Sequence, residues 1–570
     1  MAMRLECMSK TAAVYYEKDA YGTGGSRLLG RQAAGEGFLK GLVKYGVAGS
    51  LFCLAKSEQD FKAFCDQINP WAKAPRKVTW LPSNDMPGIA KAGTLYRPDP
   101  DISNLAWQRR FHDQRAYSIC GVTHTIASKA MQRVIGELLL APVQPWDAVI
   151  CTSQAVKRAY EKIFDDWGDY LVQRMGGSPS APLQLPVIPL GIDCDVFPQD
   201  EPAQASRKAV REQLGIGPDD IMVLFVGRLI FYAKAHPVPM YIALERAAQR
   251  TGKKIFLVQA GWFENAKEEA AFKKAPPQFA PSVNHIFLDG RQPDVRQHIW
   301  AGADMFVSLS DNIQETFGLT PIEAMASGLP LITTEWDGYQ ESVNHGVEGF
   351  KIPTCIPPVG SGLDIAEKYL LDNLNYSMYI AHPCLATMVD MDACTEAFVT
   401  LIEQPELRRQ MGENGRRRAR EVYDWKHVIA AYEQLWEELA EIRATADECF
   451  ARKPGRDPHP LCADPFNLFA HYSPLQLSAG SQFKSGLSNT PELRKLIHDD
   501  WMSNFGNDMR IPDASVDRLM SRLNEGGLLT AEALLADLAQ AGLPIPSEAH
   551  FYRTLGYLLK FNLIALAEES

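Results

Sequence analysis

Two successive series of short apolar runs, each run followed by a helical pattern, constrain this sequence more than any other feature. The runs are β-branched or aromatic and are flanked by turn residues, as is typical of buried parallel strands. The first series lies at 12–18, 50–55, 77–82, 117–123, 147–153 and 185–191, and the second at 221–227, 254–261, 284–290, 303–310 and 329–335. Because a twisted open sheet rarely exceeds about ten strands, two series predict two doubly wound α/β domains.

Polar stretches and helical patterns suggest the domain boundaries. The polar stretch 199–210 is a predicted linker between a first domain at 1–200 and a second domain at 205–445. We expect residues 395–445 to be helical and to end the second domain. One face of this last helix is apolar; it carries Val428, Tyr432, Leu435, Trp436 and Leu439.

The last part of the chain differs from the rest. Residues 451–465 contain four prolines and are a second predicted linker. Residues 466–570 show two amphipathic helical patterns and a short strand, an outline similar to that of winged-helix modules. Eight Lys/Arg and twelve Asp/Glu give this segment a net charge of −4, which disfavours DNA binding. We therefore expect a small, mainly helical domain that mediates protein contacts or oligomerisation.

The overall composition excludes several classes of protein. The formal net charge of −11 argues against a nucleic-acid partner. No run of 18 apolar residues is present, and residues 1–10 lack the apolar core of a signal peptide. The eleven cysteines form no CxxC pair, so we expect reduced thiols and no zinc framework. These observations favour a cytoplasmic protein and leave peripheral attachment to the inner face of a membrane open.

The strongest chemical signal is the start of a helix within residues 310–332. Thr320 suits the N-cap, Pro321 suits the first helical position, and Glu323 completes a capping box. On this interpretation Glu323 only caps the helix. The same helix start predicts a phosphate site, because unpaired N–H groups point outward there. These N–H groups belong to Phe317, Gly318, Leu319 and Thr320, and Gly318 allows a diphosphate to approach the main chain.

A family resemblance rests on this segment. Glu315 and Glu323 form an E-x7-E pair within ETFGLTPIEAMASGLPLI, which closely resembles the retaining GT-B enzymes of glycosyltransferase family 4. The resemblance implies two Rossmann-like domains that face a cleft. It implies that Glu315 contacts hydroxyls of the donor sugar and that Glu323 binds the nucleotide ribose. It further implies a UDP- or GDP-sugar as co-substrate, with no cofactor and no metal ion.

Two cations support the resemblance. Arg228 follows the strand at 221–227, and Lys234 lies six residues further on, as in the family. Cleavage of a sugar–phosphate bond builds negative charge on the diphosphate, and fixed cations with helix-terminal amides stabilise such a leaving group. A solvated loop with two basic residues is the alternative. Lys234 is followed by Ala235 and His236, where the family usually has Gly, so the loop departs from the pattern.

Further candidates lie in the first domain. His124 follows the strand at 117–123, where ligands bind in open α/β folds. Taken alone it fits a hydrogen-bonded strand-end histidine equally well; the resemblance implies that it reaches across the cleft toward the donor sugar. Gly30 and Gly35, in the glycine-rich segment 21–38, are predicted to face the phosphates. A flexible hairpin is the alternative there.

Two acidic pairs resemble the metal motif of other glycosyltransferases, and neither is required by the resemblance. They are Asp99 with Asp101, and Asp193 with Asp195. We expect Asp193 to fix a turn. The basic and aromatic segment 96–117 is a candidate for acceptor binding, although a solvated helix face with a buried Trp is the simpler interpretation. Its candidate side chains are Arg97, Trp107, Arg109 and Arg110.

The function predicted from the sequence is retaining transfer of a sugar to the hydroxyl of a glycan, lipid or small molecule. One alternative keeps the fold and changes the reaction, as in sugar-nucleotide epimerases and phosphorylases. Donor turnover without an acceptor, or dependence on phosphate, would favour it. The other alternative is a non-catalytic sensor of nucleotide sugars, which would bind a donor and transfer nothing.

Overall fold

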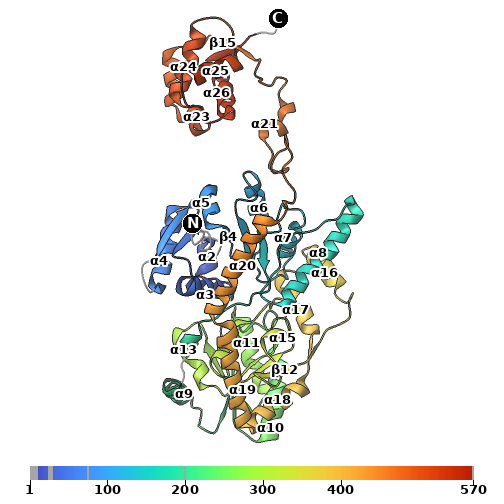
Figure 1. Cartoon of the computed structure of the whole chain (residues 1–570). Helices are drawn as coiled ribbons and strands as arrows, with labels where there is room; N and C mark the ends of the chain where they lie inside the picture. The colour runs from blue at the N-terminus through green and yellow to red at the C-terminus, as the bar shows by residue number, and fades with distance from the viewer. Residues whose placement is uncertain (1–10, 23–29, 73–75, 198–199, 568–570) are drawn as a thin grey trace. The chain divides into compact units, whose positions relative to one another are not determined.

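The computed structural model describes residues 11–22, 30–72, 76–197 and 200–567. The chain forms two compact units, Met1–His459 and Pro460–Ser570. The first unit contains two six-stranded parallel sheets, and the second contains a small antiparallel sheet among helices (Figure 1).

The first sheet has the strand order β3-β2-β1-β4-β5-β6, and Ala13 of β1 is paired with Phe52 of β2. Its strands are β1 (Ala13–Tyr15), β2 (Ser50–Leu54), β3 (Lys77–Leu81), β4 (Thr94–Tyr96), β5 (Ser118–Val122) and β6 (Ala148–Ile150). Strand β4 has only three residues and was not predicted. The predicted strand at 185–191 is wrong. It makes only isolated bridges, and Pro186 and Pro189 have no N–H to donate.

The second sheet has the order β12-β11-β10-β7-β8-β9, with Ile221 of β7 paired with Ile255 of β8. Its strands are β7 (Ile221–Val226), β8 (Ile255–Gly261), β9 (Asn284–Asp289), β10 (Met305–Ser308), β11 (Leu331–Thr334) and β12 (Gly349–Ile352). Only β12 was not predicted. Read from its own first strand, each sheet has the order 3-2-1-4-5-6 of dinucleotide-binding folds. The prediction of two doubly wound domains is confirmed.

Helices cover both faces of each sheet, as parallel sheets require. Around the first sheet lie α2 (Lys18–Tyr21), α3 (Gly30–Tyr45), α4 (Glu58–Ile68), α5 (Met86–Ala92), α6 (Ser103–Arg110), α7 (Lys129–Glu137) and α8 (Gln154–Met175). The second half contains α9 (Asp200–Leu214), α10 (Pro237–Thr251), α11 (Ala266–Lys274), α12 (Pro276–Phe279), α13 (Pro293–Gly302), α14 (Leu319–Ala326), α15 (Tyr339–Ser342), α16 (Leu363–Leu370), α17 (Tyr376–Ala386), α18 (Met391–Glu403), α19 (Pro405–Arg418) and α20 (Trp425–Thr445). A two-stranded ladder joins β13 (Thr354–Cys355) to β14 (Met388–Val389).

The predicted linker at 199–210 is wrong, because residues 200–210 lie in helix α9. Its Ala, Arg, Gln and Lys residues favour helix, and no glycine interrupts them. Val210 is buried against the second sheet. Arg207 and Arg211 both form ion pairs with Asp304. The polar residues of this segment therefore belong to a helix and do not form a linker between domains.

Helix α20 returns from the second sheet to the first. All five side chains of the predicted apolar face are buried in the core beneath the first sheet, together with side chains of α3. Trp425, at the start of α20, packs so closely on α3 that a Cβ at Gly37 would lie 2.9 Å from its ring. Helix α20 thus connects the first sheet to the second half of the first unit.

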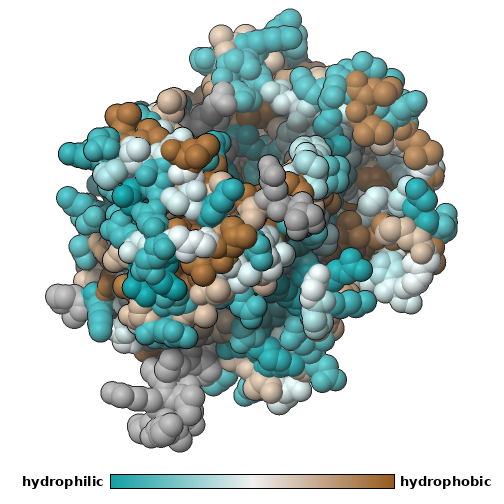
Figure 2. All heavy atoms as spheres, turned by 90° about the horizontal axis from the view of Figure 1, so that it is seen from above, coloured by the Kyte–Doolittle hydropathy of each residue, from teal (hydrophilic) through white to brown (hydrophobic). Residues whose placement is uncertain are grey.

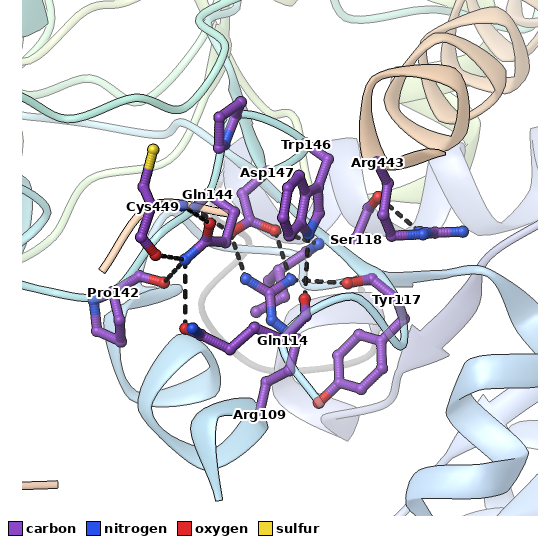
Figure 3. Close-up of polar contacts among 12 residues, drawn as sticks. Arg109, Gln114, Tyr117, Ser118, Pro142, Gln144, Trp146, Asp147, Arg443 and Cys449 are labelled. Carbon is purple, nitrogen blue, oxygen red and sulfur yellow. Dashed lines mark hydrogen bonds and ion pairs between the residues drawn. The ribbon is translucent and has the colours of Figure 1, made fainter. Parts of the chain in front are cut away.

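A fully buried ion pair lies at the amino ends of β5 and β6 (Figure 3). Arg109 and Asp147 have no exposed side-chain surface and are joined by two hydrogen bonds of 2.7 Å. Arg109 also donates to the Tyr117 carbonyl at 2.7 Å. Asp147 accepts the N–H groups of Ile119 and Gln144. The segment that follows α20 joins this network, because Cys449 exchanges two hydrogen bonds with Gln144.

The second unit is mainly helical. Its sheet has the antiparallel order β16-β15-β17. Its elements are α21 (Pro465–Leu468), β15 (Gln482–Ser485), α22 (Pro491–Asp499), α23 (Trp501–Asn504), α24 (Asp513–Asn524), β16 (Leu529–Thr530), α25 (Ala531–Gln540), α26 (Glu548–Lys560) and β17 (Ile564–Leu566). It has a core of its own around Phe483, Leu534 and Phe551.

The surface carries no membrane-spanning element in the described ranges: no helix there combines the length and hydrophobicity needed to cross a bilayer. On the face seen in Figure 2, hydrophobic side chains are scattered among hydrophilic ones. Single exposed apolar side chains of this kind are usual for folded proteins.

Candidate functional site

The loops that leave the carboxyl ends of the second sheet bring two predicted residues into contact. Lys234, after β7, forms an ion pair with Glu315, after β10. Both side chains are largely buried, with 21% and 13% of their surfaces exposed. Carboxyl ends of neighbouring parallel strands are where such folds bind ligands.

Glu315 is held as a carboxylate. Burial alone would raise its pKa, but Lys234 and the backbone N–H groups of Thr316 and Phe317 keep the pKa below its ordinary value. An ionised carboxylate accepts hydrogen bonds and donates none. Glu315 can therefore hold hydroxyl groups of a ligand.

The helix start that follows Glu315 differs from the prediction in one respect. Helix α14 begins at Leu319 and its N-cap is Gly318, so the predicted N-cap at Thr320 is wrong. Gly318 has a φ of 84°, and the chain enters the helix through a conformation open to glycine. No side chain caps this helix start, so Glu323 forms no capping box.

The N-terminus of α14 keeps its donors free. No acceptor in the described part of the chain receives the N–H groups of Gly318, Leu319 or Thr320. The Thr320 hydroxyl is also buried without a hydrogen-bond partner. The neighbouring Phe317 side chain is buried and packs against Tyr423. The site therefore offers unused donors that suit an anion, although the N–H of Phe317, also predicted to be a donor there, is directed at Glu315.

Gly318 also makes room for a buried ring, and this leads to a prediction about stability. A Cβ at Gly318 would lie 2.0 Å from Tyr339, whose hydroxyl is bonded to Ser308. We expect Gly318→Ala to lower the free energy of unfolding by about 2–4 kcal/mol, measured by urea denaturation, from backbone strain and overpacking. Gly346→Ala has a similar φ of 79° with nothing within 4 Å, and should cost only about 1 kcal/mol. Equal costs would contradict the role of Tyr339.

Glu323 lies one turn further along α14 and is not part of the Lys234–Glu315 pair. Burial raises its pKa to about 7, against a partial lowering by Arg296 of α13. Arg296 was not predicted, and nothing in its local sequence distinguishes it from a solvated helix residue. A carboxyl poised near neutrality is typical of ligand-binding sites.

Arg228 lies beside the ion pair. A Cβ built at the preceding residue, Gly227, would lie 3.6 Å from Cε of Lys234. No ion pair or hydrogen bond joins the Arg228 guanidinium to another residue of the described ranges. Arg228 also lines a small hollow with His236 and Gln259. Lys234 is thus paired with Glu315, whereas Arg228 is available to bind a ligand.

His124 forms its hydrogen bond within its own half of the molecule. Its Nε2 lies 2.7 Å from the carbonyl oxygen of Pro98. Burial lowers the pKa of His124, and the nearby Arg31 acts in the same direction. The imidazole is therefore neutral near pH 7, which fits a hydrogen-bonding role. That it contacts a donor sugar stays a prediction.

The loop after His124 nevertheless meets the second half of the molecule. The hydroxyls of Thr125 and Tyr376 lie 3.4 Å apart. Lys129 donates to the carbonyl of Tyr369 at 3.3 Å and forms an ion pair with Asp372. The partners of this loop come from α16 and α17 and the turn between them, between β13 and β14, a segment for which the sequence analysis predicted no role.

Helix α17 packs against three site loops at once. A small apolar cluster joins residues after β5, β7 and β10 to α17; it contains Ala127, Ile230, Ala233, Ile380 and the partly buried Tyr232, Ile313, Tyr376 and Tyr379. Asn312 adds hydrogen bonds to the carbonyls of Tyr232 and Ile380. The cluster holds the His124 loop opposite the Arg228–Lys234 loop.

Two glycines of the predicted donor loop have different surroundings. Gly35 does not face a ligand: it is buried within α3, where a Cβ would lie 2.1 Å from the carbonyl oxygen of Ala20. It is a packing glycine, so the prediction for it is wrong. Gly30 is the first residue of α3 and has open space around it. Residues 23–29, the rest of the predicted loop, lie outside the described residues.

The acidic pairs have structural partners. Asp193 caps a short turn and forms ion pairs with Lys40 and Lys44, which agrees with its predicted turn role. Asp99 is paired with Arg97 and accepts the N–H of Asp101. Among the residues that the structure places, no group of three or more His, Cys, Asp or Glu is arranged to hold a metal ion.

The candidate acceptor segment is occupied by internal contacts. Arg109 is fully buried with Asp147, so it is neither a ligand contact nor part of a solvated face. Arg110 donates to the Pro458 carbonyl, and Trp107 stacks on His459 at 4.3 Å between ring centroids. The side chains of this segment therefore connect the first sheet to the chain after α20.

The two Rossmann-like halves define a GT-B architecture, and the loops at the carboxyl ends of the second sheet carry the site. Residues 206–357, which hold Arg228, Lys234, Glu315 and Glu323, match the family model of glycosyl transferases group 1.

Curated relatives match a part of the chain. An uncharacterised glycosyltransferase of Methanocaldococcus jannaschii is 26% identical over 178 residues, which are 30% of this chain and 43% of that protein. D-inositol 3-phosphate glycosyltransferase of Nocardia farcinica is 27% identical over 171 residues, 30% of this chain and 36% of that protein. The chain thus spans about two fifths of the length of these relatives.

Solved structures with a similar course of the chain include HepE of Anabaena in complex with UDP, at 17% identity and a TM-score of 0.47, covering 76% of this chain and 99% of that one. Sucrose-phosphate synthase of Thermosynechococcus elongatus gives 17% identity and a TM-score of 0.45, covering 75% of this chain and 98% of that one.

Proposed function

We propose that this chain is a retaining glycosyltransferase that moves a sugar from a UDP- or GDP-sugar to an acceptor hydroxyl without a metal ion. The observation that carries the proposal is the group formed by the Lys234–Glu315 pair, the unpaired Arg228 and the free N–H groups at the start of α14. A site with two cations and a helix N-terminus suits a diphosphate, and an adjacent ionised carboxylate suits the hydroxyls of a sugar.

These groups suggest a division of roles. Arg228, Lys234 and the N–H groups of Gly318, Leu319 and Thr320 would bind the diphosphate. As the bond from the anomeric carbon to the phosphate oxygen breaks, its electron pair passes to that oxygen, and the cations stabilise the added charge. The acceptor oxygen bonds to the anomeric carbon on the vacated face, and its proton passes to the departing diphosphate. Glu315 holds the sugar ring, and Glu323 the ribose.

A thermal-shift screen tests the proposal. We expect one of UDP-, GDP- and ADP-sugars to raise the unfolding temperature of the chain, because a ligand that binds only the folded state stabilises it. The same donor should transfer its sugar to some member of an acceptor panel in the presence of EDTA. Stabilisation without transfer would favour a sensor, and phosphate-dependent turnover would favour a phosphorylase.

The pKa of Glu323 gives a pH-dependent prediction. An ionised carboxyl accepts hydrogen bonds from two ribose hydroxyls more strongly than a protonated one does, and burial raises the pKa of Glu323 to about 7. Affinity for the nucleotide sugar should therefore rise as the pH increases from about 6 to 8. Isothermal titration checks this rise, with a nucleotide sugar as ligand because its diphosphate does not change charge in this range.

The variant Glu323→Gln distinguishes the contribution of Glu323 to this pH dependence from that of other titratable groups. Glu323→Gln should bind more weakly at pH 8 and show a flatter dependence on pH. Asp311, whose pKa burial also raises to about 7, remains in that variant and reports any other contribution. An unchanged slope in Glu323→Gln would remove Glu323 from the ribose site.

A further inference from the structure

Asp337 has an unusual backbone conformation. It lies in the turn between β11 and α15, and its φ is +48°. Positive φ disfavours residues with a Cβ, although Asp and Asn tolerate it better than most. Among the described residues other than glycine, only Asp372, Phe450 and Asn562 share this feature. Such outliers are frequent at ligand sites, where the surrounding structure maintains them.

The turn lies against the loop that carries Glu315. A Cβ at Gly338, the next residue, would lie 2.8 Å from Cα of Phe317 and 3.0 Å from the carbonyl oxygen of Thr316. On the other side of Asp337, the Trp336 indole donates to the carbonyl of Asn312 at 3.1 Å. The strained residue is thus fixed at both sides to the segment around Glu315.

One oxygen of the Asp337 carboxyl is not used by the fold, while the group accepts a hydrogen bond from the backbone N–H of Gly338. Its Oδ2 is buried and has no hydrogen-bond partner in the described ranges. Burial raises the pKa of Asp337 well above its ordinary value, and the negative charge of Glu315 adds to this rise, while the hydrogen bond from the Gly338 N–H and the charge of Lys234 oppose it. An orphan polar atom inside a protein costs free energy, so it needs an explanation.

We propose that Asp337 is a second sugar-binding carboxyl of the donor site, next to Glu315. The inference rests on the proposed function and deepens it. Glu315 is ionised and only accepts hydrogen bonds, and the unpartnered Oδ2 of Asp337 is a further acceptor beside it. A ligand that satisfies both must carry donors, as neighbouring sugar hydroxyls do. Phosphate oxygens only accept, so they suit Arg228 and the start of α14 instead.

Asp337→Gly tests this proposal, because it should weaken ligand binding without destabilising the fold. Glycine adopts a positive φ freely, so the variant should unfold at the same temperature as the wild type or higher. Its affinity for UDP should stay within about twofold. Its affinity for UDP-glucose should fall roughly tenfold, and turnover with it. If the donor screen selects guanine, GDP and GDP-mannose replace the uridine pair.

Two further variants complete the test. Asp337→Asn keeps one acceptor oxygen, so it should lie between Asp337→Gly and the wild type. Asn562→Gly is the control: it also replaces a polar residue at positive φ, here 54°, between α26 and β17 of the second unit. It should change the affinity for neither ligand.

The outcomes are distinct. Wild-type affinity for UDP-glucose in Asp337→Gly would overturn the inference. Equal weakening of UDP and UDP-glucose would also overturn it, because Asp337 would then only shape the turn. If neither ligand nor its guanine counterpart stabilises the wild type, the proposed function itself fails, and the inference falls with it before any variant is made.

Discussion

Lys234→Met should lower turnover roughly 100- to 1000-fold, which is the range for removing one preorganised group that stabilises developing charge. Lys234 is the cation in contact with Glu315, next to the free N–H groups of α14. The affinity for the nucleotide sugar should change much less, since the charge on the leaving group grows only during bond cleavage. Steady-state kinetics and isothermal titration on the same preparation measure the two effects.

The loss of Lys234 also acts through Glu315. Without the cation, burial should raise the pKa of Glu315, so residual activity should need a higher pH than the wild type. The variant should also be less stable, because a mostly buried carboxylate loses its partner. Stability and turnover then fall together, and a second substitution is needed to separate them.

The double variant Lys234→Met, Glu315→Gln distinguishes the contribution of the ion pair to stability from its contribution to turnover. Removing both charges should restore much of the stability, because no buried charge is left unpaired. Turnover should stay low, because neither group is replaced. Lys273→Met, which removes an exposed pair with Glu269 in the same half of the chain, is the control and should change neither property. Recovery of turnover in the double variant would show that the pair is only structural.

The sequence predicted the second sheet and its site better than the rest. Strands of four to seven residues and the segment around Glu315 carry strong local patterns, and Lys234 meets Glu315 as both follow strand ends. Strand β4 was missed although β1 and β6 are equally short, because only two apolar residues, Leu95 and Tyr96, mark it in the sequence. Helix α9 was taken for a linker because polarity does not distinguish a loop from a solvated helix.

Residues that act through distant contacts could not be predicted from the sequence. Asp337 and Tyr376 have ordinary neighbours in the chain, and only folding places Asp337 beside Glu315 and Tyr376 beside Thr125. Gly35 was assigned to a ligand loop because glycine permits both close ligand approach and close packing. Only the position of the Ala20 carbonyl decides between them.

The largest expected loss of stability comes from Arg109. Sequence analysis offered it as an acceptor contact or a solvated residue, and the structure buries it completely with Asp147 (Figure 3). Arg109→Met should lower the free energy of unfolding by about 3–5 kcal/mol, because a carboxylate is left buried without its cation. Urea denaturation measures this loss, with hydrogen exchange of β5 showing that the first sheet is affected.

A rescue experiment shows whether the charge or the shape of Arg109 matters. Asp147→Asn in the Arg109→Met background removes the unpaired charge, while its amide oxygen still accepts an N–H from Ile119 or Gln144. We expect this double variant to be more stable than Arg109→Met alone. Arg409→Met, whose partners Glu406 and Glu413 are exposed, should cost less than about 1 kcal/mol. If Asp147→Asn destabilises Arg109→Met further, the pair acts through hydrogen bonding and packing, and the explanation by unpaired charge is wrong.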